Sequence, residues 1–291
     1  MNNLSLQKLL YNVEKKWLHE LFRFCSIQFQ QTHLPSHDQY HHFRVWHFAR
    51  ELMHELAALK YIITPELAES VILSVFLHDT GMSRSLGESH GKESVKLFKE
   101  FLSSITKEPT INLDRIFNAI ENHDNKNYIL ESFHQAFSEE HELLSILNIS
   151  DDLDAFGYIG IYRYAEIYLL RGIPLDSLAD EVIRNVDKRF LNIETTLHKM
   201  VSFTESHRKR FETTRRFYSD MSEGYYKFTG KTRSGPSGVI DLISKEIISN
   251  KKGIDYTIQL VEQNIDDEYI KNYFSKFKEE NTSFQYPQVN L

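Results

Sequence analysis

A single cysteine, Cys25, is present among the 291 residues of the chain, so no disulfide can form within it. A lone thiol is typical of proteins that work in a reducing compartment. Long apolar runs are missing as well, because no stretch approaches the roughly eighteen apolar residues that a membrane-spanning helix needs. The opening residues, MNNLSLQKLL, lack the basic start and apolar block of a secretion signal. The absence of these features predicts a cytoplasmic protein that does not enter a membrane.

Positive charge is also scarce. The 34 Lys and Arg residues are outnumbered by 41 Asp and Glu, which gives a formal net charge of -7. A protein that follows a phosphate backbone needs a basic surface, so nucleic acid is not expected as the main partner. A P-loop is excluded too, because the glycine that should precede Gly230-Lys231-Thr232 is Tyr225.

Apolar residues at helical spacing are what the chain does have. They predict one amphipathic helix from Leu4 to Gln31 and a second after Pro35. Thr64 and Pro65 are typical of an N-cap and a first helical residue, which predicts a third helix from Glu66 to Leu77. Since no hairpin signal joins the few β-prone runs, the expected fold is all-α. Further helices are expected at 91–104, 112–123, 139–149, 158–171, 176–200, 203–228, 238–250 and 267–279.

The glycine- and serine-rich segment 229–238 is the one stretch with the composition of a linker or long loop. It predicts a main domain at residues 1–229 and a helical appendage at 230–291. With 41% hydrophobic residues, the chain can bury a sizeable core. The sequence leaves open whether it forms a homo-oligomer.

Five short motifs concentrate histidine and aspartate. In VFLHDTG, His78 and Asp79 directly follow an apolar run, which places two metal-binding side chains at the end of a buried helix. Imidazole and carboxylate suit divalent manganese, iron, nickel, zinc or magnesium. The other motifs are HDQYHHFRVW at 37–46, SHGKES at 89–94, IENHD at 120–124 and ISDDLDAFG at 149–157.

Helical spacing assigns roles within two of these motifs. His41 and Arg44 are three residues apart, so one helix can offer a metal ligand and a phosphate-binding guanidinium side by side. Asp151 and Asp154 also share a face. Asp151 can then bind the ion while Asp154 orients a histidine or a water.

In order, the stretches HDQYHHFRVWHFA, VFLHDTG and SDDLDAFGYIGIYR resemble the motifs of the HD-domain superfamily of metal-dependent phosphohydrolases. The similarity covers roughly residues 30–170, and it implies an HD-domain-like helical bundle with additional C-terminal helices. Carried over by position, it implies that the metal ligands are His41, His78, Asp79 and Asp151. His90 and His123 resemble the extra histidines with which some relatives bind a second ion, so one or two ions are expected. The alternatives for this pair are direct substrate contact and a place on the surface.

The resemblance further implies a water-activating centre that hydrolyses a small phosphorylated substrate, with nucleotides as the leading class. Asp79 is the expected proton acceptor, and Arg44, Lys92 and Arg163 are expected to bind phosphate. Thr80 and Met82 depart from the common pattern, in which a lysine follows His-Asp, and Arg84 is another candidate to replace that lysine. Two alternatives stay open: a di-iron oxygenase on the same scaffold, and a catalytically silent metal-binding module for sensing or interaction.

Overall fold

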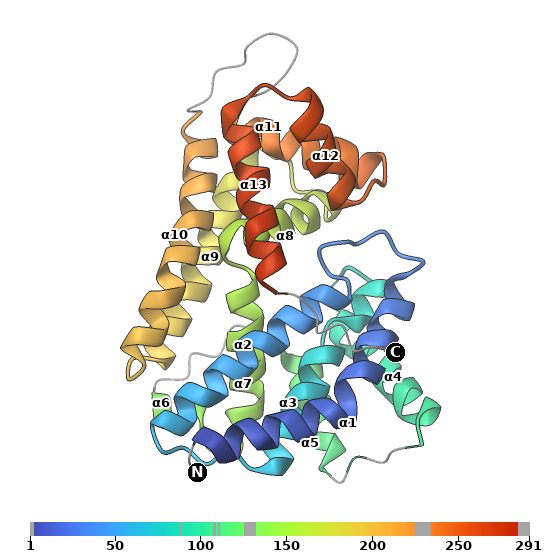
Figure 1. The fold of residues 1–291 in the computed structure, drawn as a ribbon, viewed down its shortest axis with the longest axis vertical. Coiled ribbons are helices and arrows are strands. Elements are labelled where there is room, and N and C mark those ends of the chain that lie inside the picture. Colours follow the sequence, from blue (N-terminus) through green and yellow to red (C-terminus); the bar gives the residue numbers. More distant parts are fainter. Residues whose placement is uncertain are drawn as a thin grey trace. The chain divides into compact units, whose positions relative to one another are not determined.

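The computed structural model describes residues 3–87, 89–106, 109, 111–124, 132–224 and 234–284, and throughout these ranges the regular structure is helical with no strand (Figure 1). The predicted all-α fold is therefore confirmed. None of the described helices is both long and apolar enough to cross a membrane.

The chain forms two compact units, one made of Met1–Asp154 with Asn192–Phe203 and one made of Ala155–Leu191 with Thr204–Leu291. These boundaries differ from the predicted division at 229/230. Residues 229–233 of that predicted linker lie outside the described residues, and residues 234–284 belong to the second unit.

Three long helices form the framework of the first unit, α1 (Asn3–Phe29), α2 (Gln39–Ala58) and α3 (Pro65–Leu77), and each packs against the other two. Contacts between these helices bury apolar surface and also provide hydrogen-bond partners for buried polar atoms. Trp17 of α1, for example, donates its indole N–H to Glu69 of α3 at 2.9 Å. The unit is completed by the 3-10 helix η1 (Thr80–Ser83), α4 (His90–Ser104), α5 (Leu113–Asn122), α6 (Phe133–Ala136) and α7 (Glu142–Asp154).

The central element of this unit is α3. Its N-cap is Thr64, whose side chain accepts a hydrogen bond from the backbone of Leu67, and every residue from Leu67 to Leu77 is buried. A helix that is buried all round must be surrounded by other elements, and α3 contacts α1, α2, α4, α5 and α7. The chain that leaves its C-terminus therefore starts inside the unit.

The exit from α3 depends on Gly81, which lies within η1 and has no positive φ. A Cβ atom there would meet the His90 carbonyl oxygen at 2.0 Å and the Ser94 backbone nitrogen at 2.6 Å. Glycine is needed because α4 passes directly against η1, where Ser94 Oγ accepts the Gly81 N–H at 2.8 Å.

Gly81→Ala is expected to destabilise the protein by about 1–3 kcal/mol, because backbone atoms obstruct the new methyl group and two segments must move apart. Chemical denaturation measures this difference. Gly87→Ala is the matched control, since its nearest contact would be the Ser85 hydroxyl at an ordinary 3.7 Å. Equal stability of the two variants would contradict the close approach of α4 to η1.

In the second unit, α8 (Gly157–Leu170), α9 (Leu175–Thr196) and α10 (Val201–Ser222) supply the long helices. Part of α9 and the first turn of α10 are assigned to the first unit. Aromatic contacts join α9 to α10, where Phe190 and Phe211 stack with ring centroids 4.2 Å apart. The remaining helices are α11 (Gly235–Leu242), the π-helical η2 (Ile243–Ser249), α12 (Ile254–Asn264) and α13 (Glu268–Ser283).

Candidate metal centre

The four predicted primary ligands lie together in the first unit. Asp79 Oδ2 is 3.4 Å from His41 Nε2 and 3.3 Å from His78 Nε2. Asp151 Oδ1 lies 3.9 Å and 3.8 Å from the same two nitrogens. All four residues are buried, and one ligand atom of each lies within 4.8 Å of the others. Groups from α2, α7 and the end of α3 therefore converge on one place that could hold a metal ion.

The second oxygen of Asp79 faces another pair of histidines. Asp79 Oδ1 is 2.9 Å from His123 Nε2 and 3.3 Å from His90 Nε2, and this trio also fits around a single ion. His90 is the first residue of α4, and His123 follows the last residue of α5. Asp79 thus lies between two adjoining ligand sets, one oxygen toward each.

Main-chain oxygens fix the orientation of three of these imidazoles. The Nδ1 atoms of His78, His90 and His123 lie 2.8, 2.9 and 2.6 Å from the carbonyl oxygens of the residues three positions earlier. A carbonyl only accepts hydrogen bonds, so each Nδ1 carries the proton. In the neutral ring, Nε2 then keeps its lone pair and points into the cluster, as in protein metal sites.

When the rings are neutral, the Nε2 lone pairs of the histidines face one another and the carboxylate oxygens. His90 Nε2 and His123 Nε2 are 3.3 Å apart, and both face Asp79 Oδ1. Among the described residues, no group hydrogen-bonds to the buried Nε2 of His78. Such a convergence of acceptors is stable only with positive charge among them, either protons or a cation. The donor set therefore fits a divalent metal.

The electrostatics of the cluster point the same way. Burial by itself disfavours a charged imidazole, but the negative charges of Asp79 and Asp151 outweigh it and raise the pKa of His78 to about 10. Burial likewise opposes protonation of His90, while Asp79 and then Asp124 raise its pKa to about 9. The pKa of Asp79 lies well below its usual range, because His78 and its other imidazole neighbours overcome the effect of burial. The site attracts positive charge.

The fourth imidazole is oriented by a side chain. Asp154 Oδ2 accepts a hydrogen bond from His41 Nδ1 at 2.8 Å, so Nε2 of that ring also faces the cluster. Arg44 donates to both oxygens of Asp154, from Nε at 2.7 Å and from Nη2 at 3.1 Å. Asp154 therefore orients His41, while Asp151 Oδ1 faces the Nε2 atoms of His41 and His78. Binding of an ion by Asp151 stays a prediction.

Asp154→Asn is expected to lower metal affinity by about 10- to 100-fold, the usual effect of removing a group that orients a ligand. It should also cost roughly 3–5 kcal/mol of stability, because the buried Arg44 loses the carboxylate charge to which Nε and Nη2 donate. Metal titration and chemical denaturation measure the two effects. Asp187→Asn is the control, because Asp187 is a half-exposed partner of Arg215 in the second unit. Unchanged metal affinity in Asp154→Asn would contradict the orienting role.

The predicted phosphate-binding residues differ in exposure and do not all lie in the same unit. Arg44 is buried and held by Asp154. Lys92 has a side chain that is 70% exposed, and its Nζ is 3.9 Å from Glu121. Arg84 pairs with Glu100 at 2.9 Å on the surface, and Arg163 is buried in α8 of the second unit. Phosphate binding by these residues stays a prediction.

The HH dipeptide in α2 has one member at the centre and one beside it. His41 faces Asp79 and Asp151, whereas the ring of His42 packs 5.7 Å from that of Phe29. Burial, reinforced by positive charge on His41, holds the pKa of His42 well below its usual range, so this ring is neutral. His41 is therefore the better-placed ligand, as its spacing to Arg44 predicts.

Asp124 borders the centre and is the carboxylate that our sequence interpretation did not assign. Its Oδ2 lies 3.2 Å from His90 Nε2, and its Oδ1 lies 3.9 Å from His123 Nε2. A signal for it exists in the sequence, because His123-Asp124 repeats the His78-Asp79 dipeptide.

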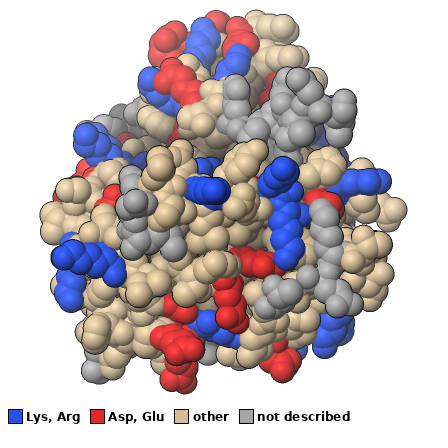
Figure 2. All heavy atoms as spheres, turned by 60° about the horizontal axis from the view of Figure 1, so that its bottom comes forward, with Lys and Arg blue, Asp and Glu red and all other residues tan. Residues whose placement is uncertain are grey.

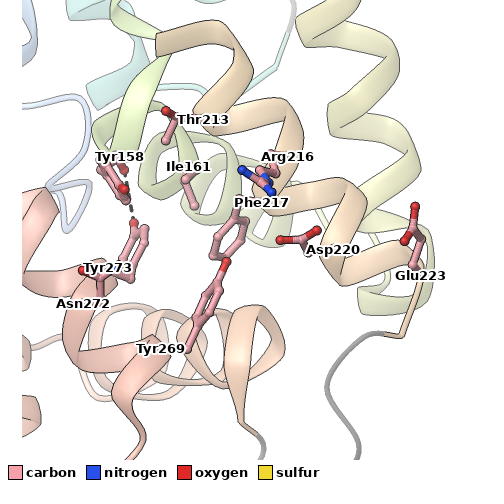
Figure 3. A pocket seen from close by; sticks show the side chains of 10 residues that line it. All are labelled: Tyr158, Ile161, Thr213, Arg216, Phe217, Asp220, Glu223, Tyr269, Asn272 and Tyr273. Carbon is pink, nitrogen blue, oxygen red and sulfur yellow. Dashed lines mark hydrogen bonds between the residues drawn. The ribbon is translucent and has the colours of Figure 1, made fainter. Parts of the chain in front are cut away.

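A pocket of about 640 Å³ lies in the second unit between α8, α10 and α13 (Figure 3). Three of the side chains that line it are buried, Ile161, Phe217 and Tyr273. Its described lining includes no histidine or cysteine, so it offers neither the imidazoles nor the thiolates of many transition-metal sites. The rest of the described lining is Tyr158, Thr213, Arg216, Asp220, Glu223, Tyr269 and Asn272.

Charges of both signs are interspersed on the face of the molecule shown in Figure 2, and Lys and Arg side chains do not gather there into one basic patch. That nucleic acid is not the main partner stays a prediction. No family model, curated protein or solved structure matches the chain.

Proposed function

We propose that this chain is a metal-dependent phosphohydrolase that cleaves a phosphate ester or anhydride of a small substrate. The observation that carries the proposal is the position of Asp79, whose two oxygens face two adjoining sets of buried imidazoles. A carboxylate shared in this way is suited to hold two divalent ions close together, as in many enzymes that transfer phosphoryl groups to water.

Divalent ions bound there would polarise a phosphoryl oxygen and lower the pKa of a water molecule toward neutrality. The chain's own residues prepare the site for this. The carbonyl-bound Nδ1 atoms of His78, His90 and His123 keep the rings fixed, so little reorganisation is needed at the moment of reaction. Since both oxygens of Asp79 face imidazole nitrogens, ligation is the role its geometry supports; proton acceptance by Asp79 stays a prediction.

The substrate class comes from the motifs rather than from the fold. Three segments resemble the HD-domain superfamily in order, and that resemblance favours nucleotides and the release of phosphate or pyrophosphate. The nitrogen and oxygen ligand set suits manganese, iron, nickel, zinc or magnesium. We propose one of these ions as the cofactor, with two bound per chain.

The test combines metal analysis with a substrate panel. The purified chain is stripped with a chelator, reloaded separately with each of the five metals, and assayed for phosphate and pyrophosphate release from nucleotides and a generic phosphate ester. Turnover that requires metal and incorporates oxygen from isotopically labelled water is the expected result. His47→Ala serves as the control, because His47 is a half-exposed histidine paired with Glu51. Metal binding without turnover across the panel would contradict the proposal.

The same ligands favour one other chemistry. Four imidazoles with two or more carboxylates can also hold redox-active iron, so a di-iron oxygenase is the second candidate function. Oxygen consumption and a mixed-valence iron signal in the iron-loaded protein would favour it. A chain that binds metal yet shows neither activity would favour the silent sensing or interaction module.

A further inference from the structure

The two ligand sets around Asp79 are unequal in number. The first contains two imidazoles and two carboxylates, His41, His78, Asp79 and Asp151. In the second, the described residues with ligand atoms mutually within 4.8 Å are Asp79, His90 and His123. Three protein ligands leave a position open around an ion, and the nearest described carboxylate on that side belongs to Asp124.

The distances of Asp124 resemble those of Asp151 in the first set. Asp151 Oδ1 is 3.9 and 3.8 Å from the Nε2 atoms of its two histidines. Asp124 approaches the Nε2 atoms of His90 and His123 to 3.2 and 3.9 Å through its two oxygens. Both imidazoles donate Nδ1–H to main-chain carbonyls, so the atoms that face Asp124 are the ones that bind metal.

We propose that Asp124 supplies the fourth protein ligand of a second divalent-metal position, formed with Asp79, His90 and His123. This inference deepens the proposed function, because it completes the same centre. The two positions then have the same ligands, two imidazoles, one terminal carboxylate and the shared Asp79.

The two carboxylates that are not shared, those of Asp151 and Asp124, differ in exposure. This difference determines how tightly the second ion is held. The side chain of Asp151 is 7% exposed, whereas that of Asp124 is 47% exposed. Solvent reaches Asp124, so a water or a substrate oxygen can replace it without disturbing the core. The second ion is therefore the more weakly held and the more exchangeable of the two.

Metal titration of the full-length, chelator-stripped chain tests the proposal. With Mn²⁺ as the probe, calorimetry counts the ions and electron paramagnetic resonance detects spin coupling between them. The wild type should bind two coupled ions. Asp124→Asn should weaken the second by on the order of 10- to 100-fold and leave the first unchanged. Asp124→Glu, which keeps a carboxylate, should recover most of the affinity.

Glu121→Gln is the matched control, because Glu121 is a similarly exposed acid on α5, paired with Lys92 rather than with the cluster. Its two Mn²⁺ affinities should equal those of the wild type. A wild-type chain that binds one ion, or an Asp124→Asn variant that binds both ions as tightly as the wild type, would overturn the assignment. The latter is also the outcome if Asp124 forms only an ion pair with His90.

The two proposals can fail separately. Metal-dependent hydrolysis by an Asp124→Asn variant with unchanged Mn²⁺ affinities would show that Asp124 is not a ligand and would still support the phosphohydrolase. Two coupled ions in the wild type, with the second weakened in Asp124→Asn and no phosphate released from any substrate, would support the ligand and reject the hydrolase.

Discussion

Replacing Asp79 with asparagine is expected to remove both metal ions and to lower turnover by at least about a thousand-fold. The side chain keeps its shape but loses the charge that both ligand sets share, with imidazoles 3.3 Å away on one side and 2.9 Å away on the other. Loss of a metal that activates water removes several kcal/mol of transition-state stabilisation. Elemental analysis and the rate of phosphate release measure the two effects.

Asp114→Asn is the control for this substitution, because Asp114 is an exposed acid at the start of α5 in the same unit. It should retain both ions and full activity. Circular dichroism should show the same helix content for both variants. An Asp79→Asn protein that still contains two ions per chain would contradict the proposal that Asp79 is shared by both ions, and with it the proposed mechanism.

Removing the metal is expected to lower the melting temperature by roughly 10 °C. An ion present at about a thousand times its dissociation constant adds about 4 kcal/mol to stability, and each kcal/mol shifts the melting temperature of a unit of this size by about 2–4 °C. Without metal, only protons on the imidazoles offset the charge of the buried carboxylates. Thermal unfolding with and without a chelator measures the shift.

The size of that shift should depend on pH, with a defined sign. The pKa of His78 is raised from 6.5 to about 10 in the folded protein, so a proton on this ring stabilises the metal-free form fully below pH 6.5, and this contribution is lost as the pH rises toward 10. A bound metal must displace that proton. The stabilisation by metal should therefore be larger near about pH 9 than near about pH 7. Equal shifts would contradict this coupling.

Helix positions could be predicted well where local signals agree. Thr64 and Pro65 define the start of α3, and the structure confirms both the cap and the first helical residue. In α2, apolar residues at helical spacing, such as Val45 and Leu56, are buried. Apolar periodicity succeeds in these helices because each one buries a face against several neighbours.

Other elements had weaker signals. No helix was predicted at α6 or α12, because α6 has only four residues and α12 carries polar residues on most of its surface. The segment predicted as one helix at 238–250 is instead α11 followed by the π-helical η2. A shift from α to π geometry changes the hydrogen-bond register without changing the apolar pattern, so periodicity does not reveal it.

For the site, the sequence motifs identified the histidines and aspartates of the cluster but did not reveal that Asp124 lies close to His90. The six metal-centre residues from His41 to Asp151 were named from their motifs, and the structure brings them together. Asp124 was overlooked because exposed acids after a helix are common and carry no periodic signal. Its proximity to His90 depends on the packing of α4 against α5, which no local pattern encodes.

The hydrogen bonds from Nδ1 to main-chain oxygens make three of the four imidazoles insensitive to changes in neighbouring side chains. A carbonyl oxygen cannot be deleted by point mutation, so sequence drift around His78, His90 or His123 leaves the direction of their lone pairs intact. His41 relies on a replaceable carboxylate. Residue 154 on α7 is thus a position where natural variation would adjust the affinity of the proposed metal centre without replacing a ligand.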